Sequence, residues 1–536
     1  MPVTPSFGLT QTDEFVFVKI KIPYVKISST ELHCEGQDFT FYCRPYLLKL
    51  SLPFCVVDDE RCRAVIDLED ENGAVTVHLP KEDHGKFFTD LDLSTKLLSL
   101  RTISDNVWSK NLKEKSACLT SNIEVLNSTE LNNFHCDGTD RKSTSPCIRA
   151  DLNLYDVSTA SIITTNSSQR YGFNNMYCKV FSTLRELFCS LLEVEDPEST
   201  PPTIRRQQRI TGEELLFCPE RYIADYLEAE QDYIYVEAMK FVPHWDIQWF
   251  RWTHHNTADS VFDELGGFNE MERNVMQNKL PRRGYVIGKN SKEEKSVILG
   301  LVDILYAYCY DHRMNIGEEN VESALNISRL SARLSWLESY EHDGDNIVLV
   351  MQYAIRRSLI YPYFRNWKFS KKILEDCAKI VLLGKKCILK SLLQVRKIFE
   401  ISDTHYIFNK IFIDDYCAYI QIIDANVFLS LGNEMNSSVR LITKEKVGLS
   451  ILAIEDFLQF ESEDESDCEC NSCKDELSNA HFSEGEEYKD YINIIDVQKK
   501  NSHRRQRGVK DMSKHLIQDM SKIAINKFDE SIEALD

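Results

Sequence analysis

The chain has 536 residues, of which 43% are hydrophobic, and it carries a formal net charge of −21. This length exceeds what one hydrophobic core usually organises, which predicts two or three domains. Residues Glu461 to Asp490 hold twelve acids against two lysines, so this run accounts for −10 of the charge and the rest of the chain for −11. Because nucleic-acid binding depends on Lys and Arg displacing counterions from phosphates, this composition argues against direct nucleic-acid binding and favours a basic partner.

The cysteine count and the apolar runs indicate the compartment. Seventeen cysteines are present, but disulfide frameworks are typical of much shorter secreted chains. The first apolar strand contains charged residues, unlike the core of a signal peptide, which favours a reducing compartment. No run reaches the roughly 18 uncharged apolar residues that a membrane helix needs, so we expect a soluble chain with no membrane contact.

Residues 1–98 have the period-two pattern of β-strands. In the segment Phe15–Ile22 apolar residues alternate with a second face that includes two lysines, as in a half-buried strand. Similar runs recur, and Asn72-Gly73 between two of them predicts a hairpin with a two-residue turn. About seven short strands in this space predict a compact antiparallel β-sandwich. A short helix within 91–100 is expected to close the domain.

Residues 99–168 are rich in Ser, Thr, Asn and Asp, with few apolar residues. Such a stretch buries too little surface to offset the entropy of ordering it, so we expect a flexible linker.

Residues 169–457 are expected to form a larger, irregular all-α domain. The basic cluster Arg205–Arg209 could contact phosphate, but we favour a solvated helix start that continues through Leu215 and Leu216. The segment Pro219–Trp252 is dense in Tyr, Phe and Trp, which could form a base-stacking platform but more often form a core. Gly384 and Gly432 are expected to separate helices.

The centre of this domain is the stretch Ser296–Leu337. Its first half has apolar residues at steps of one, three and four, which predicts a buried helix. A second helix is expected to restart after Gly317, with Glu318, Glu319 and Glu322 in its opening turn, where the helix dipole favours acids.

Residues 458–536 are expected to form a mostly disordered tail that is first acidic and then basic. The basic cluster from Lys499 to Lys510 resembles a nuclear import signal. Beyond it, Met512, Leu516, Met520 and Ile523 form an apolar stripe, which predicts a short helix near 511–528 that either docks on a partner or forms only transiently.

A search for catalytic and metal motifs gives no enzyme signature. The sequence lacks a glycine-rich phosphate loop and an H-E-x-x-H zinc helix, so we expect no catalytic residues and no cofactor. Cys468, Cys470 and Cys473 with His481 could supply four zinc ligands, but their spacing is irregular and no apolar residues surround them. We therefore expect no metal there.

Several phrases in the chain resemble a known family. The segment Asp38–Pro53, with Tyr-x-x-Pro-Tyr at its centre, is similar to the CS domain, an α-crystallin-like sandwich found in co-chaperones. Four further phrases, together with Ile360–Phe364, resemble the helical domain of the Shq family of H/ACA ribonucleoprotein assembly factors. They are Tyr308-Cys-Tyr310, Gly317-Glu-Glu-Asn-Val-Glu-Ser323, Leu383-Gly-Lys385 and Asp415-Tyr-Cys417.

The resemblance implies a non-enzymatic chaperone of dyskerin, the RNA pseudouridine synthase. Such a protein would occupy the RNA-binding surface of dyskerin as an RNA mimic during small nucleolar and telomerase ribonucleoprotein assembly, in nucleus and cytoplasm. On this reading Glu318, Glu319, Glu322, Asp414 and Asp415 would form part of the binding surface, although each could equally be a capping or solvent-facing acid. The alternative function is a general CS-domain co-chaperone of the ninety-kilodalton heat-shock protein.

Overall fold

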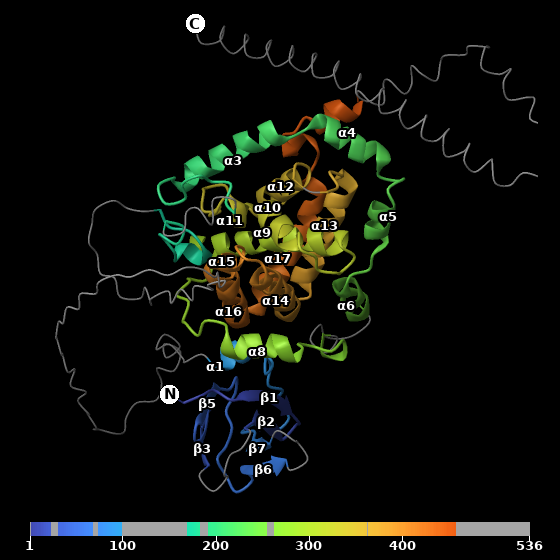
Figure 1. The fold of residues 1–536 in the computed structure, drawn as a ribbon. Helices are drawn as coiled ribbons and strands as arrows, with labels where there is room; N and C mark the ends of the chain where they lie inside the picture. Colours follow the sequence, from blue (N-terminus) through green and yellow to red (C-terminus); the bar gives the residue numbers. More distant parts are fainter. Residues whose placement is uncertain are drawn as a thin grey trace, which may run out of the picture. The chain divides into compact units, whose positions relative to one another are not determined.

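A computed structural model describes residues 2–22, 30–67, 73–98, 169–182, 191–253, 262–361 and 363–456. Antiparallel sheets come first in the chain and helices follow (Figure 1). The fold class expected from the sequence, a β-sandwich domain followed by a helical domain, is confirmed.

Two antiparallel sheets form the first domain. One sheet has the strand order β1-β2-β7-β6, with bounds Ser6–Gln11, Phe15–Lys21, Ala74–Pro80 and Arg63–Asp67. The other has the order β3-β4-β5, with bounds Glu31–Glu35, Asp38–Cys43 and Tyr46–Ser51.

The predicted alternation explains how the two sheets pack. Val16 and Val18 of β2 are fully buried, and so are Phe39 and Phe41 of β4 in the other sheet. Successive side chains of a strand point to opposite faces, so every second residue faces inward. The inward-facing residues of both sheets, including these four, form one hydrophobic cluster.

The predicted antiparallel pairing is present between β6 and β7, but its register is not centred on Asn72-Gly73. Asp67 pairs with Ala74 in the antiparallel register, which leaves six residues, 68–73, between the strands. Residues 68–72, which include Asn72, lie outside the described part of the chain.

The expected short helix is α1, Ser94–Leu98. Thr95 donates its backbone N–H to Oε1 of Gln421 at 3.1 Å and its hydroxyl to the carbonyl oxygen of Met276 at 2.7 Å. Helix α1 thus bonds to residues of the helical domain.

The remaining helices account for most of residues 202–438. They are α3 (Pro202–Leu216), α4 (Pro219–Glu228), α5 (Tyr233–Lys240), α6 (His244–Trp252), α8 (Glu270–Asn278), α9 (Lys292–Met314), α10 (Ser323–Leu330), α11 (Ala332–Ser335), α12 (Ile347–Ser358), α13 (Trp367–Leu382), α14 (Lys385–Ile401), α15 (Tyr406–Phe408), α16 (Asp414–Ile422) and α17 (Ala425–Ser438). Short 3-10 or π turns are η4 (Phe173–Asn175), η5 (Asn409–Ile413), η6 (Val439–Leu441) and η7 (Glu445–Val447).

Helix α9 is the centre of the helical domain. Of its 23 residues 17 are buried, so it is enclosed on nearly every side rather than on one face. It contacts α10, α12, α13 and α14, and it lies in the middle of the helices in Figure 1. The stretch that begins at Ser296 is therefore the core of the domain, as its periodicity predicted.

Of the two glycines predicted to separate helices, only one does so. Gly384 has a φ of +89° and separates α13 from α14, as expected. Gly432 instead lies inside α17, where an added Cβ would come within 2.6 Å of Cγ of Leu382 in α13. The absence of a side chain at Gly432 lets two helices approach closely, so its prediction as a break is wrong.

Helices α3 to α6 run along the outside of the helical domain (Figure 1). Tyr222, Tyr235 and Trp245 from these helices are buried, so they form core as predicted. The side chains of Tyr233 and Phe250 are instead 75% and 67% exposed. The aromatic residues of this region are therefore divided between the core and the solvent-facing surface.

Candidate partner-binding site

The five acidic residues predicted to bind a partner lie in two groups: Glu318, Glu319 and Glu322 after α9, and Asp414 and Asp415 at the start of α16. Helix α14 contacts both groups. Lys397 donates to Glu319 at 2.8 Å, and Arg396 donates to Asp414 at 2.7 Å. Because consecutive residues of a helix point about 100° apart, the two groups are held on different faces of α14.

The first group lies in a turn, not in the opening of the next helix. Helix α10 begins only at Ser323, because polar side chains hold the preceding residues in a turn. Asn320 donates its N–H to Oγ of Ser323 at 3.1 Å, and its Oδ1 accepts the N–H of Glu322 at 2.9 Å. Such local side-chain bonds compete with the backbone hydrogen bonds of a helix. The expectation that the three glutamates lie in the opening turn of α10 is therefore corrected: Glu318 and Glu319 precede the helix, and Glu322 is its N-cap residue.

Positive φ angles reverse the chain at the end of α9. Ile316 has a φ of +54° and Gly317 a φ of +84°. A Cβ on Gly317 would lie 3.0 Å from Cζ of Phe241, so this position needs glycine for both its angle and its space. Both constraints favour glycine at this point of the turn.

Only part of the turn faces solvent. Glu319 is bonded to Lys397 and accepts from Nε2 of Gln394 at 3.3 Å, which ties the turn to α14. Glu318 and Glu322 are exposed, and Val321 between them is 94% exposed. A hydrogen-bonded turn with two exposed carboxylates and one exposed apolar side chain suits a basic surface that also offers an apolar contact.

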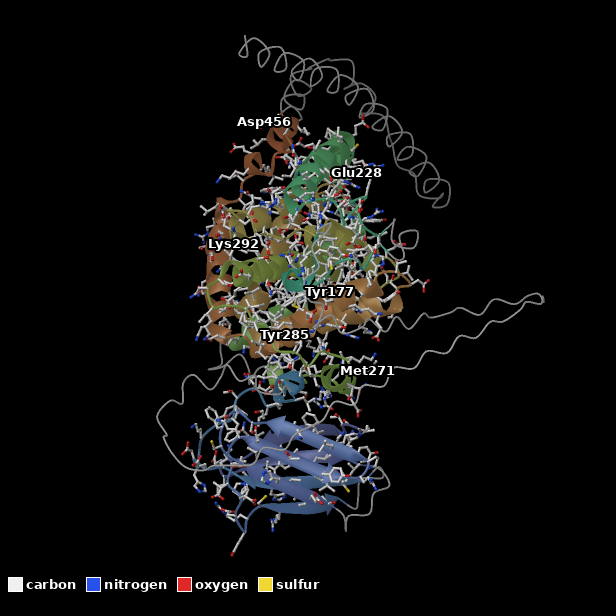
Figure 2. The ribbon with its side chains drawn as sticks, turned by 90° about the vertical axis from the view of Figure 1, so that its left-hand side faces the viewer. Tyr177, Glu228, Met271, Tyr285, Lys292 and Asp456 are labelled. Atoms are coloured by element: carbon white, nitrogen blue, oxygen red, sulfur yellow. The ribbon has the colours of Figure 1, made fainter. Side chains whose placement is uncertain are left out.

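Asp415 is an internal anchor. Its side chain is fully buried and accepts hydrogen bonds from the hydroxyls of Tyr177 and Tyr285, the latter at 2.7 Å, and it forms an ion pair with Nε of Arg283 at 3.1 Å. Figure 2 labels both tyrosines. Burial raises the pKa of Asp415, and the arginine and tyrosines oppose that rise. These bonds join the loop before α9 and residues near η4 to α16.

Asp414 is mostly buried beside Arg396. Burial raises its pKa to about 6, and the arginine only partly offsets this. Arg396 also binds Glu400 at 2.9 Å, and Glu400 accepts from Lys279 at 2.5 Å. Asp414 is therefore one member of a chain of charges between α16, α14 and the end of α8.

The basic cluster of α3 is buried, which corrects the expectation of a solvated helix start. Arg206 donates to Glu338 at 2.8 Å and to Asp345 at 2.6 Å. Arg209 is fully buried and donates to Glu213 at 3.1 Å. With their donors directed to carboxylates of the same chain, these arginines do not form a phosphate site either.

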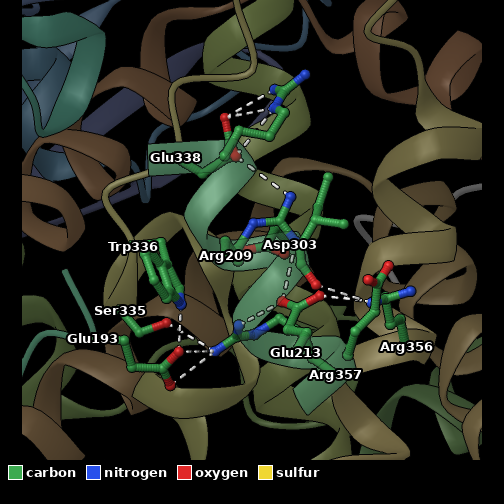
Figure 3. Close-up of polar contacts among 12 residues, drawn as sticks. Glu193, Arg209, Glu213, Asp303, Ser335, Trp336, Glu338, Arg356 and Arg357 are labelled. Atoms are coloured by element: carbon green, nitrogen blue, oxygen red, sulfur yellow. Dashed lines mark hydrogen bonds and ion pairs between the residues drawn. The ribbon is translucent and has the colours of Figure 1, made fainter. Parts of the chain in front are cut away.

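Glu213 is the centre of this buried network. It also accepts from Arg356 at 2.9 Å and from Arg357 at 2.8 Å (Figure 3). Burial alone would raise its pKa, but Arg209 and the other arginines bring the pKa below its ordinary value. Arg357 also donates a hydrogen bond to Glu193 at 3.1 Å. The network ties α3 to α12 and to the segment before α3.

Sequence reasoning missed this network because its partners are remote. Arg206 and Glu338 are 132 residues apart, and Arg357 and Glu213 are 144 apart. One local signal was available, since Arg205, Arg209 and Glu213 recur every fourth residue and so share one face of a helix.

Metal and membrane features are missing from the part of the chain that the structure describes. Within those residues, no three His, Cys, Asp or Glu side chains are grouped so that they could hold a metal ion. No helix there is long and apolar enough to cross a membrane. The cluster of Cys468, Cys470, Cys473 and His481 lies outside the described residues, and so do the linker 99–168 and the basic cluster of 499–510.

Two family models match the chain. The model described as SHQ1-like, CS domain, matches residues 4–98, which contain the β-sandwich. The model described as SHQ1 protein, Shq1 domain, matches residues 258–451, from just before α8 to beyond α17. The second match includes both groups of predicted acids.

Curated relatives are similar over most of the chain. The SHQ1 homolog of Xenopus tropicalis is 31% identical over 466 residues, which is 87% of this chain and 71% of the relative. Shq1 of Schizosaccharomyces pombe is 31% identical over 460 residues, or 84% of this chain and 96% of the relative. The SHQ1 homolog of Mus musculus is 31% identical over 84% of this chain and 74% of the relative.

Proposed function

Since this chain belongs to the SHQ1 family, we propose that it is a non-catalytic assembly factor for H/ACA ribonucleoproteins. In this role it binds a dyskerin-type pseudouridine synthase and occupies the surface that later takes RNA, in the nucleoplasm and the cytoplasm. The observation that carries the proposal is the similarity of both domains, which extends over 87% of the chain. A single CS domain would support only a general co-chaperone.

The charge of the chain supports a basic client. Outside the acidic run of 461–490 the net charge is still −11. Carboxylates fixed on a folded surface attract a cationic groove much as phosphates do, and salt weakens that attraction. RNA and this protein would thus compete for the same positive surface.

The turn after α9 is the part of the proposed surface that the geometry favours most. Glu318 and Glu322 are exposed on a turn that internal hydrogen bonds hold in place, so their charges are presented without further ordering. Glu319, Asp414 and Asp415 are engaged by groups of this chain and would act by positioning the surface and adding to its negative field.

A charge reversal tests this surface. The double substitution Glu318→Lys with Glu322→Lys changes two exposed side chains, so the fold should be kept. We expect dyskerin binding to weaken by at least about tenfold, which is about 1.4 kcal/mol, with a smaller salt dependence. Titration of labelled dyskerin at two salt concentrations measures both quantities.

The matched control reverses two exposed acids elsewhere. Glu31→Lys with Glu35→Lys changes the net charge equally, on strand β3 of the sandwich. This control should weaken binding only slightly. Equal effects of the two double variants would mean that net charge and not the turn determines affinity, and unchanged binding of the first would rule the turn out.

The second candidate function is that of a general co-chaperone of the ninety-kilodalton heat-shock protein. The match of residues 4–98 to a CS-domain model favours it. Affinity purification from cells separates the two candidates. We expect dyskerin to be the main partner, and recovery of the heat-shock protein without dyskerin would support the second candidate.

A further inference from the structure

Exposed apolar side chains concentrate on one region of the described chain. Ten of the 22 large apolar side chains that are exposed there lie between residues 204 and 250, nine of them in helices α3 to α6 and one, Val242, between α5 and α6. Single exposed apolar residues are common on protein surfaces, but such a concentration marks an interaction site.

The densest part lies along α4 and at its two ends, and we call it the α4 face. Its apolar members are Leu215, Leu216, Tyr226, Leu227, Tyr233 and Ile234. Leu215 is 83% exposed, and Leu227 is 47% exposed. Helix α4 buries Tyr222 and Ile223, whereas Tyr226 and Leu227, one turn later on the same side, are exposed. In Figure 1 α3, α4 and α5 follow one another along the outside.

Acidic side chains surround these apolar residues. Four exposed glutamates lie on the same helices and the loop between them: Glu214, Glu220, Glu228 and Glu230. The basic groups near them are the exposed Arg221, Lys368 at 3.8 Å from Glu230 and Arg356 at 3.5 Å from Glu214. The last two pairs are long and involve exposed glutamates. The face is thus apolar with an acidic rim, which fits a basic amphipathic helix.

The chain itself continues from this place. Tyr222 of α4 donates its hydroxyl to Glu455 at 2.5 Å, one residue before the last described residue, Asp456. Figure 2 labels Asp456 and Glu228 at the same end of the helical domain. The sequence after Asp456 therefore starts beside the α4 face.

A segment of suitable composition follows in the sequence. Residues 510–528 hold four Lys against two Asp, a net charge of +2, and residues 499–509 before them add five Lys and Arg without an acid. Within 510–528, Met512, Leu516, Met520 and Ile523 recur at steps of four, four and three, which places them on one side of a helix. The 53 residues from 457 to 509 can span far more than the length of α4.

We propose that residues 510–528 bind the α4 face of the same chain as an amphipathic helix. The four apolar residues cover the apolar members of the face, and the lysines face the glutamate rim. An external client would then have to displace this segment to use the α4 face. Because the contact is intramolecular, dilution leaves it intact, whereas salt weakens it.

Photo-crosslinking of the full-length chain tests the proposal. A photoreactive phenylalanine at position 516 should crosslink within one chain to peptides from 213–236, with a yield that does not change on dilution. The substitution Leu227→Glu, at an exposed position, should reduce that yield by at least about fivefold. Crosslinks confined to other peptides would overturn the proposal, and crosslinks only between copies would assign the face to a second copy instead.

Hydrogen exchange with matched tail variants gives a second readout. Leu516→Glu with Met520→Glu places two acids on the apolar stripe, while Gln518→Glu with Ser521→Glu places two acids on the other side. Amides of 215–234 should exchange faster in the first variant only. Equal exchange in the wild type and both variants would show that the segment does not cover this face.

Discussion

Single residues in the helical domain carry buried charge, and Glu213 is the clearest case. Its carboxylate accepts from three arginines, two of which are fully buried. Removing one member of a buried charge network leaves its partners uncompensated, which costs more than the pair itself contributes. The stability of α3 on the domain should depend on this one side chain.

We therefore expect Glu213→Gln to lower the free energy of unfolding by about 3–5 kcal/mol. Glu214→Gln is the matched control, since that neighbouring side chain is 57% exposed and should change stability by less than about 0.5 kcal/mol. Chemical denaturation of both variants measures the difference. If both variants changed the free energy of unfolding by similarly small amounts, the buried arginines would not require the charge of Glu213.

Buried histidines predict the pH dependence of stability. Burial lowers the pKa of His244 to about 3 and those of His312 and His405 to about 4. In the unfolded chain they titrate near 6.5, so below that pH the unfolded state binds protons that the folded state does not. Their contribution is complete above about pH 6.5 and is lost as the pH falls towards 4.

At pH 5 each histidine should cost about 2 kcal/mol of stability relative to pH 7. Asp414 acts in the opposite direction, because its pKa of about 6 favours the folded state as the pH falls. Other buried aspartates with raised pKa values, such as Asp415, also act in this opposite direction. Unfolding measured at pH 7 and pH 5 therefore tests the histidine by comparison, and His312→Gln should lose less stability between the two pH values than the wild type. A variant with the same pH dependence as the wild type would contradict the assignment to His312.

Single residues also show what the sequence could not predict. The acids and arginines were recognisable as types, but whether Asp415 or Arg209 was exposed depended on partners more than a hundred residues away. Glu318 and Glu322 were predicted as helix-opening acids and lie in a turn because Asn320 and Ser323 hold the backbone first.

Among the elements, α17 and α13 show how a helix contact can depend on one glycine. Gly432 of α17 faces Leu382 so closely that an added methyl group would lie 2.6 Å from its Cγ. In α3, Gly212 also lies within a helix, but nothing within 4 Å would meet its Cβ. Both glycines lie in helical backbone, but only Gly432 is packed against another helix.

We expect Gly432→Ala to destabilise the protein by about 1–3 kcal/mol through overpacking. Gly212→Ala should instead stabilise it by about 0.5–1 kcal/mol, because alanine is the better helix former. Thermal unfolding of both variants checks the opposite signs. Two stabilised variants would mean that α13 and α17 can separate without loss.

Periodicity predicted the elements well for a physical reason. Alternation along β2 and the long apolar run of α9 follow from burial, which is a local property of the pattern. The register of β6 with β7 and the role of Gly432 depend on pairing and packing between segments, which no local pattern contains. The start of α10 depends on local side-chain bonds of Asn320 and Ser323 that apolar periodicity does not show.

For the whole molecule, the proposed function requires competition between an acidic protein and RNA for one basic surface. The net charge of −21 makes encounter with a cationic partner faster at low salt. It also means that this protein should be repelled by RNA, so the two cannot share the partner surface cooperatively.

The most direct measurement is equilibrium binding of this protein to dyskerin as H/ACA RNA is added. We predict that the apparent affinity falls in proportion to the free RNA concentration above its own dissociation constant, without a complex that contains all three molecules. A stable ternary complex, with the affinity for dyskerin unchanged at saturating RNA, would contradict the account.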